Sequence, residues 1–463
     1  MKGNRKKVSF FIILLIVIQN DAGIGSYYST PESVPQMLKI IDVRKKRAVT
    51  VRARSGRNSN TSIERSVAEI LANVKAKGDD ALRSYAKKFD GAKITSIDVD
   101  AGETAEAKRS ADPKFISILE RAAKNIRRFH EQQKRKNWKI KERSGSDLRQ
   151  LFLPIEKVGV YIPGGKAAYP STVLMNVIPA QVAGVKEIYL VSPPDKEGNI
   201  HRDVLAAASM LGVKHIYRAG GAQAIAALAF GTDTIPAVDK IVGPGNIFVA
   251  TAKRMVYGIV GIDSFAGPSE VVILADNSAD PLFVASDMLA QAEHDERAVS
   301  VLVTPSRSFA DNVQSEIKNL LIGLPRKEII QQSLLNNGRI YIVKSIQQGI
   351  DIVNDLAPEH LEIITTNSES DLKKIRHAGS IFLGNYSPVA IGDYFAGPNH
   401  VLPTEHTARF SSPLSVDDFV KKSSVIRYSQ KRMEEVSEDV ARFADHEKLS
   451  AHALSLRLRG SQQ

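Results

Sequence analysis

The sequence contains no cysteine in its 463 residues. This absence excludes a disulfide scaffold, a zinc site built on thiolates, an iron–sulfur cluster and an enzyme with a cysteine nucleophile. Hydrophobic residues make up 43% of the chain and charged residues 25%, which is typical of a soluble globular protein and excludes wholesale disorder or a collagen-like chain. The length predicts two or three domains, because one core rarely grows this large.

Long hydrophobic runs are also missing. The longest apolar stretch, residues 8–18, has Ser9 as its only polar member and is about half as long as a membrane-spanning helix requires. It follows the basic residues 1–7 and so resembles a signal-peptide core, although residues 22–25 make a poor cleavage site. Three interpretations stay open: a targeting or anchoring segment, translation that starts near Met37, and a packed N-terminal strand. Membrane contact is expected only through this run.

The excess of positive charge is confined to the N-terminal end. Residues 1–57 hold twelve basic and three acidic residues, so they carry +9 of the net charge of +12. A basic tail suits targeting, anionic lipid or nucleic acid. A second basic stretch, residues 121–143, includes Phe129 and Trp138, but it fits a solvated helix face as well as a nucleic-acid surface. No RRM, KH or helix-turn-helix pattern is present, so we expect no nucleic-acid partner.

The body of the chain alternates short β-branched runs with helical patterns, which cover residues 61–77 and 113–133. Four apolar runs end in loops that contain glycine or proline: residues 158–162, 187–191, 215–217 and 240–242. This rhythm predicts a doubly wound parallel sheet whose ligands lie beyond the carboxyl ends of its strands. The G-x-G-x-x-G dinucleotide fingerprint is absent, so the glycine loops are either phosphate-binding turns or only tight turns.

A second α/β unit is predicted after residue 270. Its expected helices cover residues 281–293 and 345–356, and the stretch from Asp417 to the C-terminus is predicted to be helical and charged. Its expected strands are residues 271–275, 299–304, 340–343, 361–365 and 381–383. The predicted fold class is therefore α/β with two Rossmann-like, doubly wound parallel sheets.

Polar residues at the ends of helices and strands are candidates for chemistry. Gln291 and His294 can reach one metal ion from one helix, although a histidine at a helix end is also a common solvated cap. Glu359 and His360 precede a strand and either offer an acid–base pair or form a surface turn. The other candidates lie in glycine-rich loops or in the last helix, where a spacing of five separates two of them: Asp393, His400, Glu447 and His452.

Taken in order, these motifs resemble those of the histidinol dehydrogenase family over about residues 60–458. Eight motifs in the family's order carry the resemblance: VYIPGG at 160–165, GGAQAIA at 220–226, GPGN at 243–246, AGPSE at 266–270, QAEH at 291–294, PEH at 358–360, GDY at 392–394 and NHVLPT at 399–404. Glu447 and His452 close the series. The resemblance implies a four-electron oxidation of L-histidinol through L-histidinaldehyde to L-histidine, in histidine biosynthesis, with two NAD and one zinc ion per subunit.

The resemblance also implies roles for residues of this sequence. His360 is expected to move protons, and Glu359 to activate the water that attacks the aldehyde. An aldehyde oxidation needs a nucleophile, and without a cysteine thiolate activated water is the obvious candidate. The implied zinc ligands are Gln291, His294, Asp393 and His452, and the implied NAD contacts are Tyr161, Gln223 and Asn246. The implied substrate contacts are Ser269, Gln291, His294, Glu359, Asp393, His400, Glu447 and His452.

The resemblance further implies a cytoplasmic homodimer with a shared active site, in which a helical C-terminal dimerisation segment crosses to the partner. The expected organisation is a basic extension (1–57), a discontinuous α/β domain (58–157 with 271–416), an NAD-binding α/β domain (158–270) and a C-terminal segment (417–463). Two other functions stay open. One is a related zinc alcohol dehydrogenase such as a sulfopropanediol dehydrogenase, against which His400 and Glu447 argue; the other is a protein that binds nucleic acid or membranes.

Overall fold

The computed structural model describes residues 38–46, 61–143, 145–164, 168–264 and 267–461. The hydrophobic run 8–18 lies outside these residues, as does most of the basic extension. Among the described helices, none combines the length and the apolar character needed to cross a bilayer.

The first sheet has five parallel strands in the order β6-β5-β4-β7-β8. Counted along the chain, this is the order 3-2-1-4-5, which confirms the predicted doubly wound sheet. Its strands are β4 (Lys157–Tyr161), β5 (Glu187–Ser192), β6 (His215–Arg218), β7 (Lys240–Val242) and β8 (Gly261–Ile262), and its helices are α4 (Pro170–Ala183), α5 (Arg202–Met210), α6 (Gly221–Phe230) and α7 (Ile247–Val256). The central strand β4 is buried on both faces, as its continuous apolar sequence requires.

The first three long helices pack on this same sheet. They are α1 (Thr61–Tyr85), α2 (Ala101–Ser110) and α3 (Pro113–Glu131). Leu82 of α1 shares a core with Ile225 of α6, and Ile126 of α3 shares a second core with Val158 of β4. Helix α1 is interrupted at Gly78, where a helix end was expected: this glycine takes a φ of 51°, outside the helical range, and a second helical stretch follows it to Tyr85.

This packing differs from the domain organisation expected from the sequence. The segment 58–157 was grouped with residues 271–416, whereas its helices bury their apolar faces against the sheet of residues 157–262. The physical reason is simple: helical periodicity shows that a helix has an apolar face but does not show which sheet will cover it.

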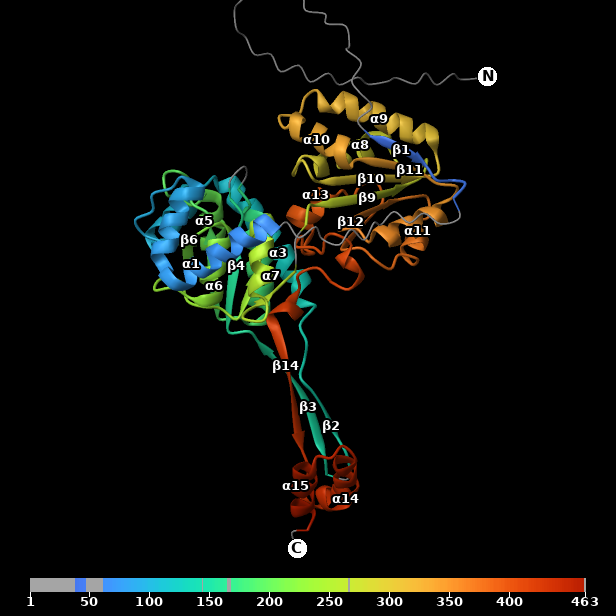
Figure 1. Ribbon diagram of the computed structural model, residues 1–463. Helices are drawn as coiled ribbons and strands as arrows, with labels where there is room; N and C mark the ends of the chain where they lie inside the picture. Colours follow the sequence, from blue (N-terminus) through green and yellow to red (C-terminus); the bar gives the residue numbers. More distant parts are fainter. Residues whose placement is uncertain (1–37, 47–60, 144, 165–167, 265–266, 462–463) are drawn as a thin grey trace, which may run out of the picture. The chain divides into compact units, whose positions relative to one another are not determined.

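The second sheet has six parallel strands in the order β1-β11-β10-β9-β12-β13. Figure 1 shows α8, α9 and α10 on one side of this sheet and α11 on the other, in agreement with its two apolar cores. The strands are β1 (Lys39–Asp42), β9 (Glu270–Ala275), β10 (Val299–Thr304), β11 (Arg339–Ile342), β12 (His360–Ile364) and β13 (Ser380–Leu383), and the helices are α8 (Pro281–Ala292), α9 (Arg307–Leu321), α10 (Lys327–Asn337) and α11 (Ile346–Leu356).

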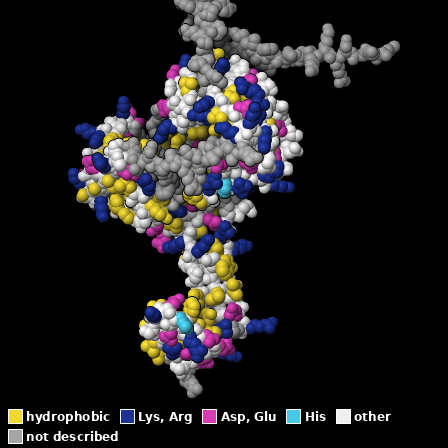
Figure 2. All heavy atoms as spheres, turned by 45° about the vertical axis from the view of Figure 1, so that its right-hand side comes forward, with side chains coloured by type: hydrophobic (Ala, Val, Ile, Leu, Met, Phe, Trp, Pro, Cys, Tyr) yellow, Lys and Arg dark blue, Asp and Glu magenta, His cyan; other side chains and the backbone are white. Residues whose placement is uncertain are grey.

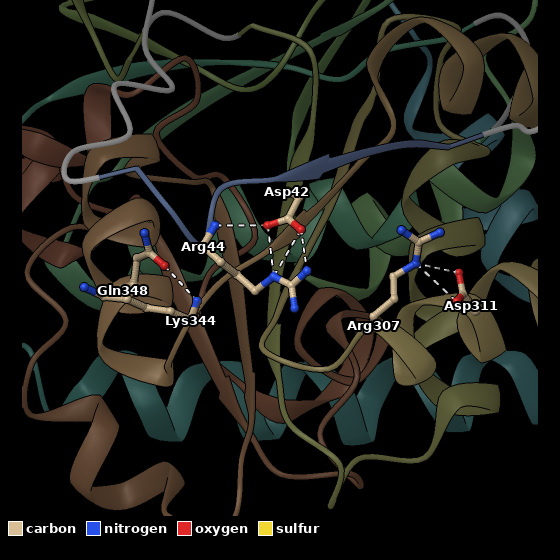
Figure 3. Close-up of polar contacts among 6 residues, drawn as sticks. All are labelled: Asp42, Arg44, Arg307, Asp311, Lys344 and Gln348. Atoms are coloured by element: carbon tan, nitrogen blue, oxygen red, sulfur yellow. Dashed lines mark hydrogen bonds and ion pairs between the residues drawn. The ribbon is translucent and has the colours of Figure 1, made fainter.

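Strand β1 corrects the expected N-terminal boundary. The sequence interpretation placed residues 39–42 in the basic extension, but they form the edge strand that pairs with β11. Gln348 of α11 secures the end of this strand, because its Nε2 donates to the carbonyls of Val43 and Lys46, at 3.1 and 3.2 Å. Its Oε1 accepts a hydrogen bond from the Lys344 N–H, and Arg44 pairs with Asp42 nearby (Figure 3). Two isoleucines among charged residues gave too weak a pattern to predict this strand.

A third, antiparallel sheet was not predicted. It has the order β14-β3-β2, formed by β2 (Trp138–Lys141), β3 (Asp147–Pro154) and β14 (Val420–Arg427). The C-terminal segment is thus not helical from Asp417: a 3₁₀ turn and β14 precede α14 (Gln430–His446) and α15 (Ser450–Gly460). Most residues of β14 are exposed, so its sequence lacks the apolar pattern of a buried strand.

A buried ion pair supports the loop at the carboxyl end of β7. The side chains of Lys253 and Asp263 are 3% and 4% exposed and form an ion pair. Lys253 Nζ also donates to the carbonyl of Gly243 at 3.0 Å, and Asp263 Oδ2 accepts from the Gly243 N–H at 2.7 Å. The pair therefore binds both the carbonyl and the N–H of Gly243, which is the first residue of the loop that leads to α7.

We expect Lys253→Met to lower the free energy of unfolding by about 3–5 kcal/mol, because the Asp263 charge would stay buried without its partner. Urea unfolding followed by circular dichroism measures this loss. The exposed Lys186, changed to methionine, is the control and should shift stability by less than about 0.5 kcal/mol. Equal stability of the two variants would contradict the predicted role of the pair.

Candidate active site

The carboxyl end of the five-stranded sheet carries a cavity of about 710 Å³. Tyr161, Gln223 and Asn246 all line it. Tyr161 ends β4, Gln223 lies in the first turn of α6, and Asn246 is the N-cap of α7. The structure therefore brings together the three residues expected to contact NAD, at the edge of the sheet where doubly wound folds bind their ligands.

Local backbone chemistry explains why glycines surround these residues. The Gly221 N–H donates to the Tyr161 hydroxyl at 3.1 Å. Gly243 has a φ of 114°, and a Cβ atom there would lie 2.1 Å from the carbonyl oxygen of Tyr161, so no larger residue fits. Burial raises the pKa of Tyr161 to about 12, so its hydroxyl stays neutral. Asn246 Oδ1 accepts from the N–H groups of Phe248 and Val249, which leaves its amide NH₂ free to donate.

A second cavity, of about 200 Å³, lies at the edge of the six-stranded sheet where the strands begin. His360, Asp393 and His400 line it. His360 is the first residue of β12 and Ser380, also in the lining, is the first residue of β13. These side chains thus gather at the amino ends of the six-stranded sheet, and not at its carboxyl ends as the general rule for such sheets would suggest.

The orientation of His360 is fixed by the backbone of the neighbouring strand. Its Nδ1 lies 3.0 Å from the carbonyl oxygen of Glu270, which can only accept, so Nδ1 carries a proton. Nε2 is buried, lacks a hydrogen-bond partner and lies 3.7 Å from Asp393 Oδ1. Burial alone would lower the pKa of His360, but the charge of Glu359 and the contact with Asp393 hold it well above its usual range. Nε2 is therefore the ring atom available for proton transfer in the cavity.

Glu359 also hydrogen-bonds to Glu270, the first residue of β9. It is 6% exposed, and its Oε2 accepts a hydrogen bond from the Glu270 N–H at 2.8 Å and lies 3.5 Å from His360 Nδ1. Glu270 was not predicted as a site residue, although it closes the motif at 266–270. Its N–H and its carbonyl orient both members of the acid–base pair. Burial and the charge of Glu359 raise the pKa of the Glu270 side chain to about 8.

Three of the expected metal ligands come from two elements. Gln291 ends α8 and is 3% exposed, and His294 follows it with its N–H bonded to the Gln291 carbonyl. Asp393 lies in a π-helical turn (Gly392–Ala396) after the short helix α13 (Val389–Ile391). Burial would raise the pKa of Asp393, but contact with His360 and the nearby His400 and His294 hold it below its usual range. Of these histidines, His360 lies nearest, with its Nε2 3.7 Å from Asp393 Oδ1.

Within one chain, this cluster does not include the other expected site residues, which are Glu447, His452 and Ser269. Glu447 follows α14, Lys448 takes a φ of 62°, and His452 lies in the first turn of α15, so the helix ends between the two candidates. Both are exposed, and neither lines the cavity of about 200 Å³. Ser269 lies just before β9, where its carbonyl accepts from the Val299 N–H. The described residues contain no group of three His, Asp or Glu side chains that could hold a metal ion.

Two doubly wound α/β sheets, a large cavity at the carboxyl end of one and a buried Glu–His–Asp cluster at the amino end of the other are typical of an α/β enzyme with acid–base chemistry. Residues 53–460 match the family model described as histidinol dehydrogenase. The chain belongs to the histidinol dehydrogenase family.

Individual relatives agree with this assignment. The chain is 53% identical over 396 residues to the histidinol dehydrogenase of Halalkalibacterium halodurans, covering 86% of this chain and 93% of that protein. It is 54% identical over 395 residues to the Bacillus subtilis protein of the same name, covering 85% and 92%. The crystal structure of histidinol dehydrogenase from Elizabethkingia anophelis superposes with a TM-score of 0.84 at 39% identity, over 92% of this chain and 98% of that one.

Proposed function

We propose that this chain oxidises L-histidinol through L-histidinaldehyde to L-histidine, with a zinc ion in the site and NAD as the oxidant. One observation carries the proposal: His360 is held between Glu359 and Asp393 in a cavity that also contains His400, in a chain that belongs to the histidinol dehydrogenase family. A neutral imidazole at His400, whose pKa burial lowers, suits recognition of the imidazole end of the substrate.

The side chains present fit a zinc ion. The chain has no cysteine, so the site must use nitrogen and oxygen donors, and Gln291, His294 and Asp393 supply three of these. Gln291 would use its amide oxygen Oε1, because its amide Nε2, which is buried without a hydrogen-bond partner, can only donate. His452 of the partner subunit would complete the set. When bound, zinc supplies a Lewis acid that stabilises negative charge on oxygen.

In the proposed reaction His360 acts in the oxidation of the alcohol, and Glu359 acts in the oxidation of the aldehyde. His360 acts as the base in its neutral form: Nε2 then takes the proton of the substrate alcohol, while the Glu270 carbonyl keeps Nδ1 protonated and the ring fixed. NAD, when bound in the cavity lined by Tyr161 and Asn246, supplies the hydride acceptor. Glu359 then accepts a proton from the water that adds to the aldehyde, which leaves the hydrate as an anion. Loss of a second hydride from this anion, which a second NAD would accept, gives the acid. Burial of the His360 and Glu359 side chains limits competing reactions with bulk water.

We further propose a homodimer in which α14 and α15 deliver Glu447 and His452 to the partner's cavity. The sheet β14-β3-β2 and these helices expose many large apolar side chains, and Figure 2 shows hydrophobic surface there. The exposed residues include Trp138, Ile140, Ile426, Val440, Phe443, Leu454 and Leu458. Apolar surface of this extent is typical of a subunit interface.

The substrate test compares two alcohols. The purified enzyme with zinc and NAD is given L-histidinol or 2,3-dihydroxypropanesulfonate, and NADH is followed by absorbance while the product is identified by mass spectrometry. We expect two NADH for each L-histidine formed and no turnover of the sulfonate. Release of one NADH with an aldehyde product, or preferential turnover of the sulfonate, would contradict the proposal.

A further inference from the structure

The cavity of about 710 Å³ has a carboxyl group in its wall that the mechanism above does not use. Asp90 lines this cavity together with Tyr161 and Asn246. It is the last residue of a π-helical turn (Ala86–Asp90) that follows α1. Its Oδ2 atom is buried and has no hydrogen-bond partner among the described residues. Because an unpaired buried carboxylate oxygen costs free energy, a ligand that donates a hydrogen bond to it would bind more tightly.

Asp90 lies beside the loop that follows β5. Ala86, at the start of its turn, shares an apolar core with Val191 of β5. A Cβ atom on Gly91, the residue after Asp90, would lie 3.7 Å from Cγ of Lys196 in the loop. Counted along the chain, β5 is the second strand of the five-stranded sheet. In doubly wound folds that bind dinucleotides, an acidic residue near the end of the second strand accepts a hydrogen bond from the 2′-hydroxyl of the adenosine ribose.

The acidic residue that the loop itself offers already has another role. Asp195 is exposed, and its Oδ1 accepts a hydrogen bond from the Asn199 N–H at 2.7 Å. The backbone of Asp195 also pairs with Asn199 and Gly198. Its carboxylate therefore stabilises the turn of its own loop, whereas the buried Oδ2 of Asp90 remains for a ligand.

The charge of this wall disfavours a second phosphate. Among the described lining residues, the acidic ones are Asp90, Asp195 and Glu197, against Lys196 as the basic one. Burial raises the pKa of Asp90 to about 6, so the group is charged at about pH 8. NADP differs from NAD by a phosphate on the 2′-oxygen, and this phosphate would lie against the Asp90 carboxylate. Like charges placed together in this way reject the wrong ligand.

We infer that Asp90 accepts a hydrogen bond from the 2′-hydroxyl of the adenosine ribose and thereby selects NAD over NADP. The inference rests on the proposed function in so far as NAD is the oxidant. Asp90 would contact the cofactor but not the reacting atoms, so its loss should weaken cofactor binding rather than slow the chemical steps.

Removing one oxygen atom from the cofactor tests the contact directly. Calorimetry at about pH 8 measures the binding of NAD, of NADP and of NAD that lacks the 2′-hydroxyl on its adenosine ribose. We expect the full unmodified chain to bind the deoxy cofactor about tenfold more weakly than NAD, because a hydrogen bond to a charged group is lost. Asp90→Ala should bind NAD and its deoxy form with affinities within about twofold of each other, because neither can make that bond.

The preference for NAD over NADP is the second measurement. Asp90→Ala should narrow this preference about tenfold or more, because the repulsion of the 2′-phosphate is removed. Asp90→Asn keeps the shape of the side chain and removes its charge, so it should narrow the preference as well, and it replaces Asp90→Ala if that variant does not fold. Glu120, an exposed carboxylate on α3, is the control, and Glu120→Gln should leave all three affinities unchanged.

Two outcomes would overturn this inference alone. One is an unmodified chain that binds NAD and its deoxy form equally well, a comparison that needs no variant. The other is a folded Asp90→Ala or Asp90→Asn chain whose ratio of NADP to NAD affinity is unchanged, which would make the role of Asp90 merely structural. An unmodified chain that binds neither NAD nor NADP would overturn the proposed oxidant and this inference with it.

Discussion

Replacing Glu359 by glutamine is expected to slow oxidation of the aldehyde by about 100-fold or more while leaving oxidation of the alcohol much less affected. Only the second oxidation needs water to be activated, and an amide cannot accept the proton of that water. The glutamine oxygen can still accept the Glu270 N–H, so the fold should not change. Rapid mixing of the variant with L-histidinol should give one NADH at near-normal speed and the second slowly.

A control variant separates this effect from a general loss of charge. Glu369 is an exposed carboxylate on α12 (Ser368–Leu372), and Glu369→Gln should leave both steps unchanged. L-histidinaldehyde supplied directly should reproduce the slow second step of Glu359→Gln. Equal rates of alcohol and aldehyde oxidation by an intact Glu359→Gln protein would show that Glu359 does not activate the water.

Changing His452 to alanine is expected to reduce zinc affinity by more than about 100-fold and to lower activity in parallel, because loss of a direct ligand exceeds the usual effect of losing a supporting residue. Zinc content by elemental analysis and the rate of NADH formation measure the two effects. The exposed His446, changed to alanine, is the control on the same helical pair and should retain both zinc and activity.

The proposed sharing of the site between subunits makes a sharper test possible, since a dimer of two different variants would then contain one complete site. When His452→Ala and Glu359→Gln chains are co-expressed, the His452→Ala chain keeps its own Glu359 and receives His452 of the partner subunit. Random assembly into twofold dimers should then restore about a quarter of normal activity. If His452 acted within its own chain, every site would carry one defect, and formation of L-histidine by the mixture would stay at the low level of the two variants alone.

The parts of the fold that the sequence predicted are those with buried strands. Strands such as β4, β9 and β10 are continuous apolar runs because helices cover both faces of a parallel sheet. Strand β14 and its partner β3 are largely exposed or half-buried, and they lie more than 260 residues apart, so neither pattern nor spacing identified them. Strand β1 was not predicted for a related reason, because charged residues surround its two isoleucines.

Some residues of the candidate site could likewise be predicted from the sequence, and others could not. Its side chains in glycine-rich or strand-end motifs, such as His360 and Asp393, could be named from the sequence once the motifs were taken together. Glu270 acts through its backbone N–H and carbonyl, which every residue possesses, so its side chain gave no sign of that role.

The long ladder between β3 and β14 makes the C-terminal end of this chain an integral part of its architecture. Every residue of β14 is in register with one of β3, and β3 is followed directly by the central strand β4 of the five-stranded sheet. A protein shortened before Val420 would leave one edge of β3 without its partner, and such bare edges recruit strands from other molecules and promote aggregation. Affinity tags and fusion partners therefore belong after the last helix, where they leave this pairing intact.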